Sequence, residues 1–320
     1  MKNEIELKKI ANLLQDPVVD RVLVACHRSP DGDACGSAHA LGHALRKMGK
    51  QVAIFCPDPF GERFSYLVEK EAFEADFEPS FFITVDIASP EMLCGADFAD
   101  RIDLALDHHR INTVSAKHHY VDADSASCGE IILDLIGYLP VSPEAYLAEA
   151  LYTALVSDTG CFRYSNTNEN CYRAAALLAS FAEEGAFYRI NKRLFETKTP
   201  KEMMIEGYAA REVGLFADNR VAYLSVSLAE QKRLGASYEE LDQVINVIRK
   251  LEGVLVSVVL KERESGVFKI SVRSEEAFDA AAFCAHFGGG GHRAAAGCTV
   301  EGDEKEVLSR VLQEAERRLS

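Results

Sequence analysis

The sequence predicts an α/β fold in which a doubly wound, mainly parallel sheet is followed by a second, smaller α/β domain. Two observations support this expectation. Short apolar runs such as "RVLVAC" and "QVAIFC" do not alternate with polar residues, which is typical of parallel strands covered on both faces. Helical patterns separate these runs, and beyond residue 215 the pattern changes to longer strands that include a hairpin.

The first domain is expected over residues 1–196. Four apolar runs, at 21–26, 51–56, 81–87 and 101–107, are its candidate strands. Apolar residues recur at helical spacing between the first two runs, and Gly49 supplies a C-terminal stop for that helix. Residues 126–196 are expected to be mainly helical.

A connecting segment with a helix of its own is expected over 197–214, and the second domain over 215–320. In the second domain "RVAYLSVSL" predicts a strand and 237–251 predicts a helix. The runs "VLVSVVLKE" and "VFKISVRS" predict a hairpin that turns near Gly266.

Composition narrows the class of protein. The chain has 320 residues with a net charge of −15, which argues against a broad basic surface for long DNA or RNA. No apolar run is long enough for a membrane span, and the N-terminus lacks the apolar region of a secretory signal, so a cytoplasmic protein is expected. The nine cysteines include no C-x-x-C pair and are expected to be buried thiols rather than zinc ligands.

Acidic and histidine residues follow the predicted strands and one predicted helix. Functional groups of open α/β sheets gather beyond the carboxyl ends of the strands. The residues at these positions are His27, Asp31, Asp33, Asp86, Asp107, His108, His109, Arg110 and, at the end of the helical stretch "LYTALVSD", Asp158. We therefore expect these side chains to share one site.

Each of these residues also has a purely structural explanation. Asp31-Gly32 fits an ordinary turn, Asp86 fits a helix cap, and Asp158 fits the end of a helix. The adjacent histidines His108 and His109 fit surface positions at a strand end. Together, however, they would crowd uncompensated negative charge at one end of a sheet. Two divalent cations would balance four aspartates, since −4 plus +4 is zero, and oxygen ligands with imidazole suit Mn²⁺.

The same residues carry a resemblance to a known family. "HRSPDGDACGSA", "VDIAS", "DHHR" and "SDTG" resemble the four motifs of the DHH phosphoesterases, and "GGGGHRAAAG" at 288–297 resembles the signature of the DHHA1 domain. At this length the chain is most similar to the nano-RNase and pAp phosphatase branch. The resemblance implies a DHH catalytic domain followed by a DHHA1 substrate-binding domain.

The resemblance also implies roles for individual residues. His27, Asp31 and Asp86 would hold one Mn²⁺, and Asp33, Asp86, His108 and Asp158 the other, with Asp86 bridging. Mg²⁺ and Co²⁺ are the alternative metals. Asp107 would orient the metal site, and His109 would assist the leaving oxygen, with a purely supporting role as the alternative.

Substrate contacts are expected from both domains. A glycine run allows close backbone approach to an anion, with a plain flexible loop as the alternative. Alternation along "VFKISVRS" puts Arg273 on the more polar face of its strand, where a solvated position is the alternative. The candidate substrate-binding residues are Arg110, Arg163, Arg273, Gly289, Gly290, Gly291, His292 and Arg293.

The resemblance implies hydrolysis of very short oligonucleotides and removal of the 3′-phosphate of adenosine 3′,5′-bisphosphate (pAp). The resemblance and the absence of an extended basic track together suggest a length of about two to four nucleotides. Cyclic-dinucleotide or linear dinucleotide phosphodiesterase and inorganic pyrophosphatase are the alternative activities. The remaining alternative is a protein that binds nucleotides without catalysing a reaction. No membrane partner is expected, and a homodimer is compatible with the sequence.

Overall fold

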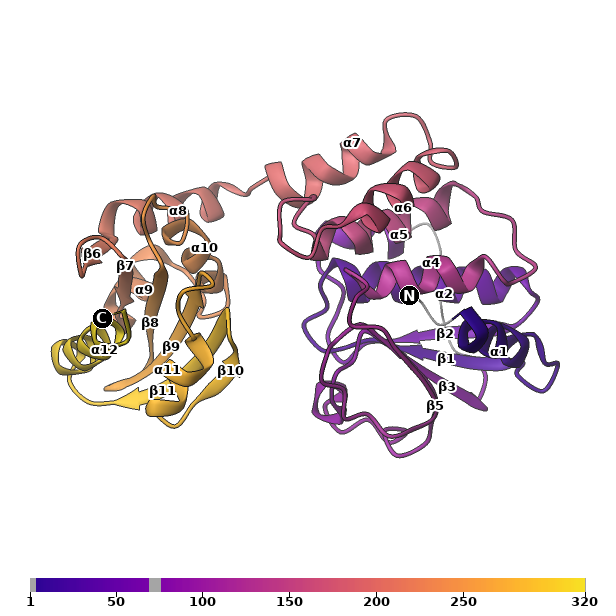
Figure 1. Ribbon diagram of the computed structural model, residues 1–320, viewed down its shortest axis with the longest axis horizontal. Helices are drawn as coiled ribbons and strands as arrows, with labels where there is room; N and C mark the ends of the chain where they lie inside the picture. The colour runs from indigo at the N-terminus through magenta and orange to yellow at the C-terminus, as the bar shows by residue number, and fades with distance from the viewer. Residues whose placement is uncertain (1–3, 69–75, 320) are drawn as a thin grey trace. The chain divides into compact units, whose positions relative to one another are not determined.

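The chain forms two compact units, Met1–Thr197 and Lys198–Ser320, each with a sheet of its own (Figure 1). This computed structural model describes residues 4–68 and 76–319. The first unit contains a parallel sheet with helices and the second a mixed sheet with helices, so the predicted α/β fold class is confirmed. Among the described helices, none has both the length and the apolar composition needed to cross a membrane.

The first unit alternates strands and helices. Its strands are β1 (Arg21–Ala25), β2 (Gln51–Phe55), β3 (Phe81–Val85), β4 (Ile102–Asp107) and β5 (Ala116–Val121). Its described α-helices are α1 (Glu4–Gln15), α2 (Gly32–Lys47), α3 (Ser65–Val68), α4 (Cys128–Ile136), α5 (Ala145–Asp158), α6 (Glu169–Ala179) and α7 (Ala186–Asn191). Two 3₁₀ turns, η1 (Glu62–Phe64) and η2 (Pro90–Leu93), and a π-helical turn, η3 (Lys192–Glu196), complete the described helical segments of this unit.

All five strands of the first sheet are parallel, in the order β2-β1-β3-β4-β5. Four of them correspond to the apolar runs of the sequence. Because the strands are parallel, the residues that follow β1, β3 and β4 lie at the same edge of the sheet. This arrangement gathers the polar residues at the strand ends.

Strand β5 was not predicted. It lies at the edge of the sheet and pairs with β4 alone among the described strands. Lys117, His118 and His119 are exposed along it, so it lacks the apolar run by which the four other strands were recognised. Polar side chains are common on edge strands because they discourage pairing with another chain.

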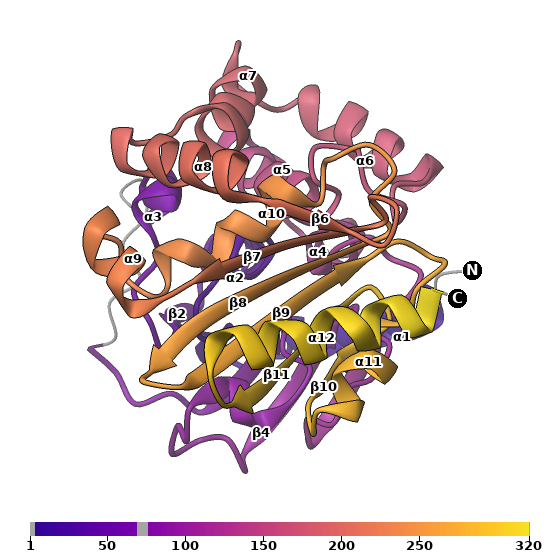
Figure 2. The ribbon, with the colours of Figure 1, turned by 90° about the vertical axis from the view of Figure 1, so that its left-hand side faces the viewer.

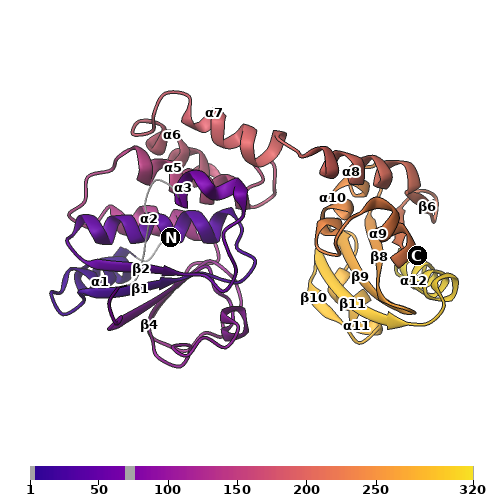
Figure 3. The same ribbon diagram turned by 180° about the vertical axis from the view of Figure 1, so that it is seen from behind.

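Helices cover one face of this sheet. Buried side chains of α1, α2 and α4, such as Leu14, Leu41 and Ile132, share a core with Val22 and Val24 of β1. The opposite face is covered by η2 and irregular segments, whose apolar residues Leu93, Phe98 and Val114 are buried there. Figure 3 shows α2 lying along the sheet, with α5 and α6 beyond it.

Helices α2 and α5 approach each other closely because glycine replaces larger residues at their contact. A Cβ atom added to Gly36 would lie 2.3 Å from the carbonyl oxygen of Ala150, and one added to Gly32 would lie 2.7 Å from the Cβ of Ser157. Neither position accepts a side chain without moving α5. The start of α2 is therefore held against the end of α5.

The second unit has strands β6 (Gly214–Phe216), β7 (Val221–Val226), β8 (Val256–Glu264), β9 (Val267–Ser274), β10 (Gly290–His292) and β11 (Ala295–Glu301). Its helices are α8 (Pro200–Glu212), α9 (Leu228–Leu234), η4 (Glu240–Gln243), α10 (Val244–Ile248), α11 (Ala280–His286) and α12 (Glu304–Leu319). The strand order is β10-β11-β9-β8-β7-β6, and only the β7–β8 pair is parallel.

Helices lie on both faces of this second sheet. The predicted hairpin is β8 and β9, and the core on one of its faces includes residues of α11 and α12 such as Phe283 and Val311 (Figure 2). On the other face, Ile205 and Tyr208 of α8 pack with Ile245 of α10. The helix expected in the connecting segment thus contributes to the core of the second unit.

Candidate metal centre

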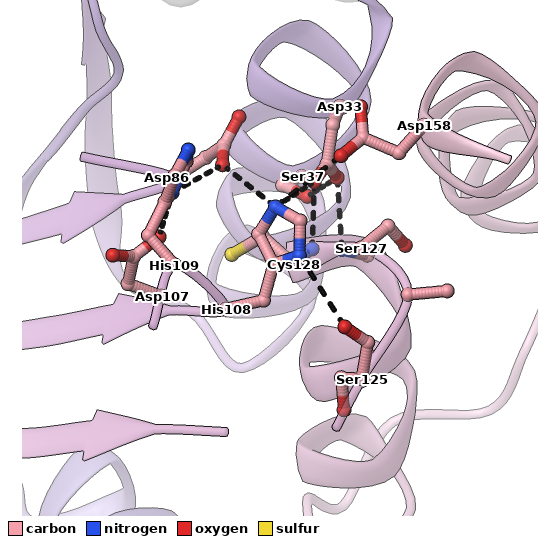
Figure 4. Close-up of polar contacts among 12 residues, drawn as sticks. Asp33, Ser37, Asp86, Asp107, His108, His109, Ser125, Ser127, Cys128 and Asp158 are labelled. Carbon is pink, nitrogen blue, oxygen red and sulfur yellow. Dashed lines mark hydrogen bonds and ion pairs between the residues drawn. The ribbon is translucent and has the colours of Figure 1, made fainter. Parts of the chain in front are cut away.

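Six polar side chains from five elements of the first unit converge beyond the carboxyl ends of its strands. Figure 4 shows several of them and their contacts. His27 follows β1, Asp86 follows β3, His108 follows β4, and Asp158 is the last residue of α5. Asp31 caps α2 and Asp33 lies in its first turn. The structure thus brings together all six residues that the sequence suggested as metal ligands.

His27, Asp31 and Asp86 form one group of potential ligands. One ligand atom of each lies within 4.8 Å of those of the other two. The Nε2 atom of His27 is 3.5 Å from Oδ2 of Asp86 and 3.8 Å from Oδ1 of Asp31. Its Nδ1 atom lies 2.7 Å from the carbonyl oxygen of Arg28, a contact that turns Nε2 toward the carboxylates.

His108, Asp33 and Asp158 form a second group. The Nε2 atom of His108 is 3.3 Å from Oδ2 of Asp158, 3.5 Å from Oδ1 of Asp86 and 3.6 Å from Oδ2 of Asp33. Its Nδ1 atom faces the carbonyl oxygen of Ser125 at 3.3 Å (Figure 4). As with His27, a backbone carbonyl orients the imidazole and directs Nε2 into the cluster.

Asp33 is fully buried, and donors from α2 and α4 hold its carboxylate. The backbone N–H groups of Cys128 and Gly129, at the start of α4, donate to Oδ2 and Oδ1 at 2.6 and 3.0 Å. The Ser37 hydroxyl donates to Oδ1 at 2.9 Å (Figure 4). A carboxylate has about four acceptor positions, so these three bonds leave one for a cation.

Asp86 lies between the two groups. Its Oδ2 faces His27 and its Oδ1 faces His108, each at 3.5 Å. The side chain is buried, and no described residue forms a hydrogen bond to Oδ1. Its backbone has a φ of 57°, a left-handed conformation that is uncommon for residues other than glycine. A strained, buried aspartate with an oxygen lacking a hydrogen-bond donor fits a ligand shared by two cations.

The negative charges of the four aspartates in this cluster repel one another, and the two histidines alone do not neutralise them. Burial, together with the charges of Asp86 and Asp158, raises the pKa of Asp31 to about 6 and raises that of Asp33 well above its usual value. Burial disfavours the charged form of His108, but its carboxylate partners outweigh burial and raise its pKa to about 12. Divalent cations would relieve this repulsion, so the donor set fits hard metal ions.

Asp107 and His109 form a separate hydrogen-bonded pair beside the ligands. Oδ1 of the buried Asp107 lies 2.8 Å from Nδ1 of His109, and this bond raises the pKa of His109. Asn112 donates its Nδ2 to Oδ2 of Asp107 at 2.6 Å. Sequence reasoning missed Asn112, because an asparagine in an irregular segment has no distinctive pattern.

The two arginines suggested from the first unit are both exposed. The Nε atom of Arg163 donates to the carbonyl oxygen of Gly160 at 2.5 Å, and its guanidinium lies 5.4 Å from the ring centroid of Phe195. Arg110 directly follows His109. Their role in substrate binding remains a prediction.

The substrate-binding candidates of the second unit lie on neighbouring strands. Arg273 of β9 pairs with Ala295 of β11, which pairs with His292 of β10. A Cβ atom on Gly289 would lie 2.2 Å from the carbonyl oxygen of Gly297, and Gly291 has a φ of 142°. The backbone therefore requires glycine at both positions.

Two arginines of this region donate to backbone carbonyl groups. Arg293 is exposed and donates to the carbonyl oxygen of Glu276 at 3.1 Å, and Arg273 donates to that of Val272 at 3.0 Å. Gly290 is exposed within β10. The side chain of His292 lies outside the described residues.

Fold and site together define a two-domain α/β protein with a carboxylate and histidine centre at the end of a parallel sheet. Residues 21–155 match the model of the DHH family, N-terminal domain, and residues 218–320 match that of the DHHA1 domain. This chain belongs to the DHH family and carries a DHHA1 domain.

Relatives of known name agree with this assignment. The chain is 32% identical over 321 residues to the bifunctional oligoribonuclease and PAP phosphatase NrnA of Thermus thermophilus, covering 98% of this chain and 95% of the relative. A solved structure, an exopolyphosphatase-related protein from Bacteroides fragilis, has a TM-score of 0.85 at 22% identity, covering 99% of this chain and 98% of the other. RecJ of Thermus thermophilus, solved with Mn²⁺, has a TM-score of 0.53 at 14% identity, covering 98% of this chain and 54% of RecJ.

Proposed function

We propose that this protein is a metal-dependent phosphoesterase that degrades very short oligonucleotides and removes the 3′-phosphate of pAp. The observation that carries the proposal is the pair of histidine and carboxylate groups that share Asp86. The near full-length relative named as a bifunctional oligoribonuclease and PAP phosphatase supports this choice of substrates.

The proposed metal content is two divalent cations, Mn²⁺ in preference to Mg²⁺ or Co²⁺. His27, Asp31 and Asp86 would hold one, and Asp33, Asp86, His108 and Asp158 the other. Such cations supply two kinds of chemistry, neutralisation of phosphate charge and a lowered pKa of water at neutral pH. The mixture of carboxylate and imidazole ligands is the basis for preferring Mn²⁺.

His109 is the proposed proton donor to the leaving oxygen. Its Nδ1 atom is 2.8 Å from Asp107, which leaves Nε2 as the ring nitrogen available to substrate. The Asp107 carboxylate raises the pKa of His109, which increases the share of imidazolium that can donate a proton. Asp107 therefore acts through His109 in this proposal.

The second unit is proposed to bind the substrate through the glycine-rich stretch and nearby arginines. Gly290 and Gly291 are exposed backbone without side chains, Gly289 packs closely against β11, and Arg273 and Arg293 add positive charge. Because the protein has a net charge of −15, these local contacts are expected to bind only a few phosphate groups. The cytoplasmic location and a homodimer remain predictions.

A panel of substrates tests the proposed function. With Mn²⁺, dinucleotides to tetranucleotides and pAp should be hydrolysed much faster than long RNA, since no extended basic track rewards chain length. The same panel should contain cyclic dinucleotides and pyrophosphate, the substrates of the alternative activities. Rapid digestion of long RNA, a preference for pyrophosphate, or full activity after rigorous metal removal would contradict the proposal.

Arg293→Ala tests the role of the second unit. Loss of a charge-assisted phosphate contact, which contributes about 1.5–3 kcal/mol, should raise KM for a dinucleotide or pAp about 10- to 100-fold. Hydrolysis of a small artificial phosphodiester should change little. Arg263→Ala, which removes an exposed arginine of β8, is the matched control. Equal losses on all three substrates would exclude a specific phosphate contact.

A further inference from the structure

Asn112 uses the Nδ2 group of its side-chain amide to connect two strand ends beside the candidate metal centre. Its Nδ2 group donates to Oδ2 of Asp107 at 2.6 Å and to the carbonyl oxygen of Ile87 at 2.8 Å. Its Oδ1 atom accepts the backbone N–H of Val114 at 2.9 Å. The side chain therefore joins the segment after β3 to the end of β4.

The contact with Asp107 fixes how that carboxylate faces His109. Asp107 is fully buried, and its two oxygens have different partners: Asn112 at Oδ2 and Nδ1 of His109 at Oδ1. If the Asn112 amide were absent, the carboxylate would lose the buried hydrogen bond at Oδ2, and among the described residues only the bond to His109 would limit its rotation about the Cβ–Cγ bond. The orientation of the His109 ring would then no longer be fixed.

The contact with Ile87 extends this effect to the neighbouring strand. Ile87 directly follows Asp86, whose backbone has the strained φ of 57° and donates its N–H to the carbonyl oxygen of Leu106 at 3.0 Å. Asn112 holds the carbonyl group that follows this strained residue. The same amide thus links the segment carrying Asp86 with the pair Asp107 and His109.

We propose that Asn112 is a positioning residue for the hydrolytic reaction, acting through Asp107 to set the direction in which Nε2 of His109 points. This inference rests on the proposed function. Only a neutral amide supplies two N–H donors here. An aspartate would place a carboxylate against the Asp107 carboxylate and a carbonyl group, both of which are acceptors.

Steady-state kinetics of Asn112→Ala and of the nearly isosteric Asn112→Asp provide the first test. Loss of a residue that orients an active-site group through a hydrogen bond typically lowers activity 10- to 100-fold, so kcat for a dinucleotide should fall by about that factor. KM and the Mn²⁺ content should stay near those of the wild type. Thr113→Val is the matched control, because Thr113 donates to the carbonyl oxygen of Ala88 at 3.4 Å in the same segment without touching Asp107.

A double-mutant cycle separates positioning from general support of the fold. If Asn112 acts through His109, Asn112→Ala should lower kcat no further in a His109→Ala background. A full additional loss in that background would overturn the inference. So would unchanged kcat in both Asn112 variants, or a kcat loss that parallels a loss of metal.

Histidine ¹⁵N NMR of the metal-free protein gives a readout independent of activity. The Nδ1–H signal of His109, assigned by its absence in His109→Ala, should shift or broaden in Asn112→Ala and stay unchanged in Thr113→Val. An unchanged signal in Asn112→Ala would contradict the inference. If the wild type hydrolyses none of the substrates, the proposed function fails, whereas the NMR comparison still decides whether Asn112 orients His109.

Discussion

Asp86→Ala is expected to abolish metal binding and hydrolysis together. Asp86 faces His27 with one oxygen and His108 with the other, so its loss removes a ligand from both groups at once. The expected fall in kcat exceeds about 100-fold, which is more than is typical for loss of a residue that only hydrogen-bonds to a metal ligand. Metal analysis of the purified protein and kinetics with added Mn²⁺ measure the two effects.

Asp103→Ala is the matched control for Asp86. Asp103 is also a buried aspartate of the same sheet, but it lies near the start of β4, where Lys117 donates to it at 2.7 Å and the N–H of Phe82 at 2.9 Å. Its loss should lower thermal stability and leave the metal content unchanged. Full metal content in Asp86→Ala would exclude Asp86 as the shared ligand.

His109→Ala is expected to lower kcat about 10²- to 10⁴-fold, the range for loss of general acid catalysis, with the metal content retained. The physical reason is that Nδ1 of His109 is bonded to Asp107, whereas Nε2 of His108 faces three aspartates. The two adjacent histidines should therefore respond differently to substitution. Metal analysis beside kcat and KM measures this difference.

His118→Ala is the control, because His118 is an exposed histidine of β5. Loss of metal in His109→Ala would show that the roles assigned to the adjacent histidines are wrong. A normal kcat would instead support the alternative in which His109 has no role in proton transfer.

The sequence predicted four of the five strands of the first sheet, and the cluster, because both follow from strong local patterns. β1, β3 and β4 are short, mostly apolar runs, and in a parallel sheet the residues that follow them must meet at one edge. The strand pattern alone was therefore enough to place His27, Asp86 and His108 together. The agreement extends to Asp158, which ends α5.

Other features depend on tertiary contacts that have no local pattern. β5 is recognised only by its pairing with β4. The importance of Asn112 arises from groups 5 and 25 residues away in sequence. The left-handed backbone of Asp86 could not be foreseen, because no glycine or asparagine marks the position.

If Asp33 and Asp158 hold the proposed cation, the glycines between α2 and α5 offer a way to change the preferred cation radius without substituting either aspartate. Asp33 lies on α2 and Asp158 ends α5, so the width of the site depends on how closely these two helices pack. Gly32 and Gly36 set that approach. A methyl group at Gly36 would clash with the carbonyl oxygen of Ala150 and force α2 and α5 apart. With the proposed cations bound, a wider gap between the carboxylates would favour larger ions, since selectivity among hard cations depends on cavity size.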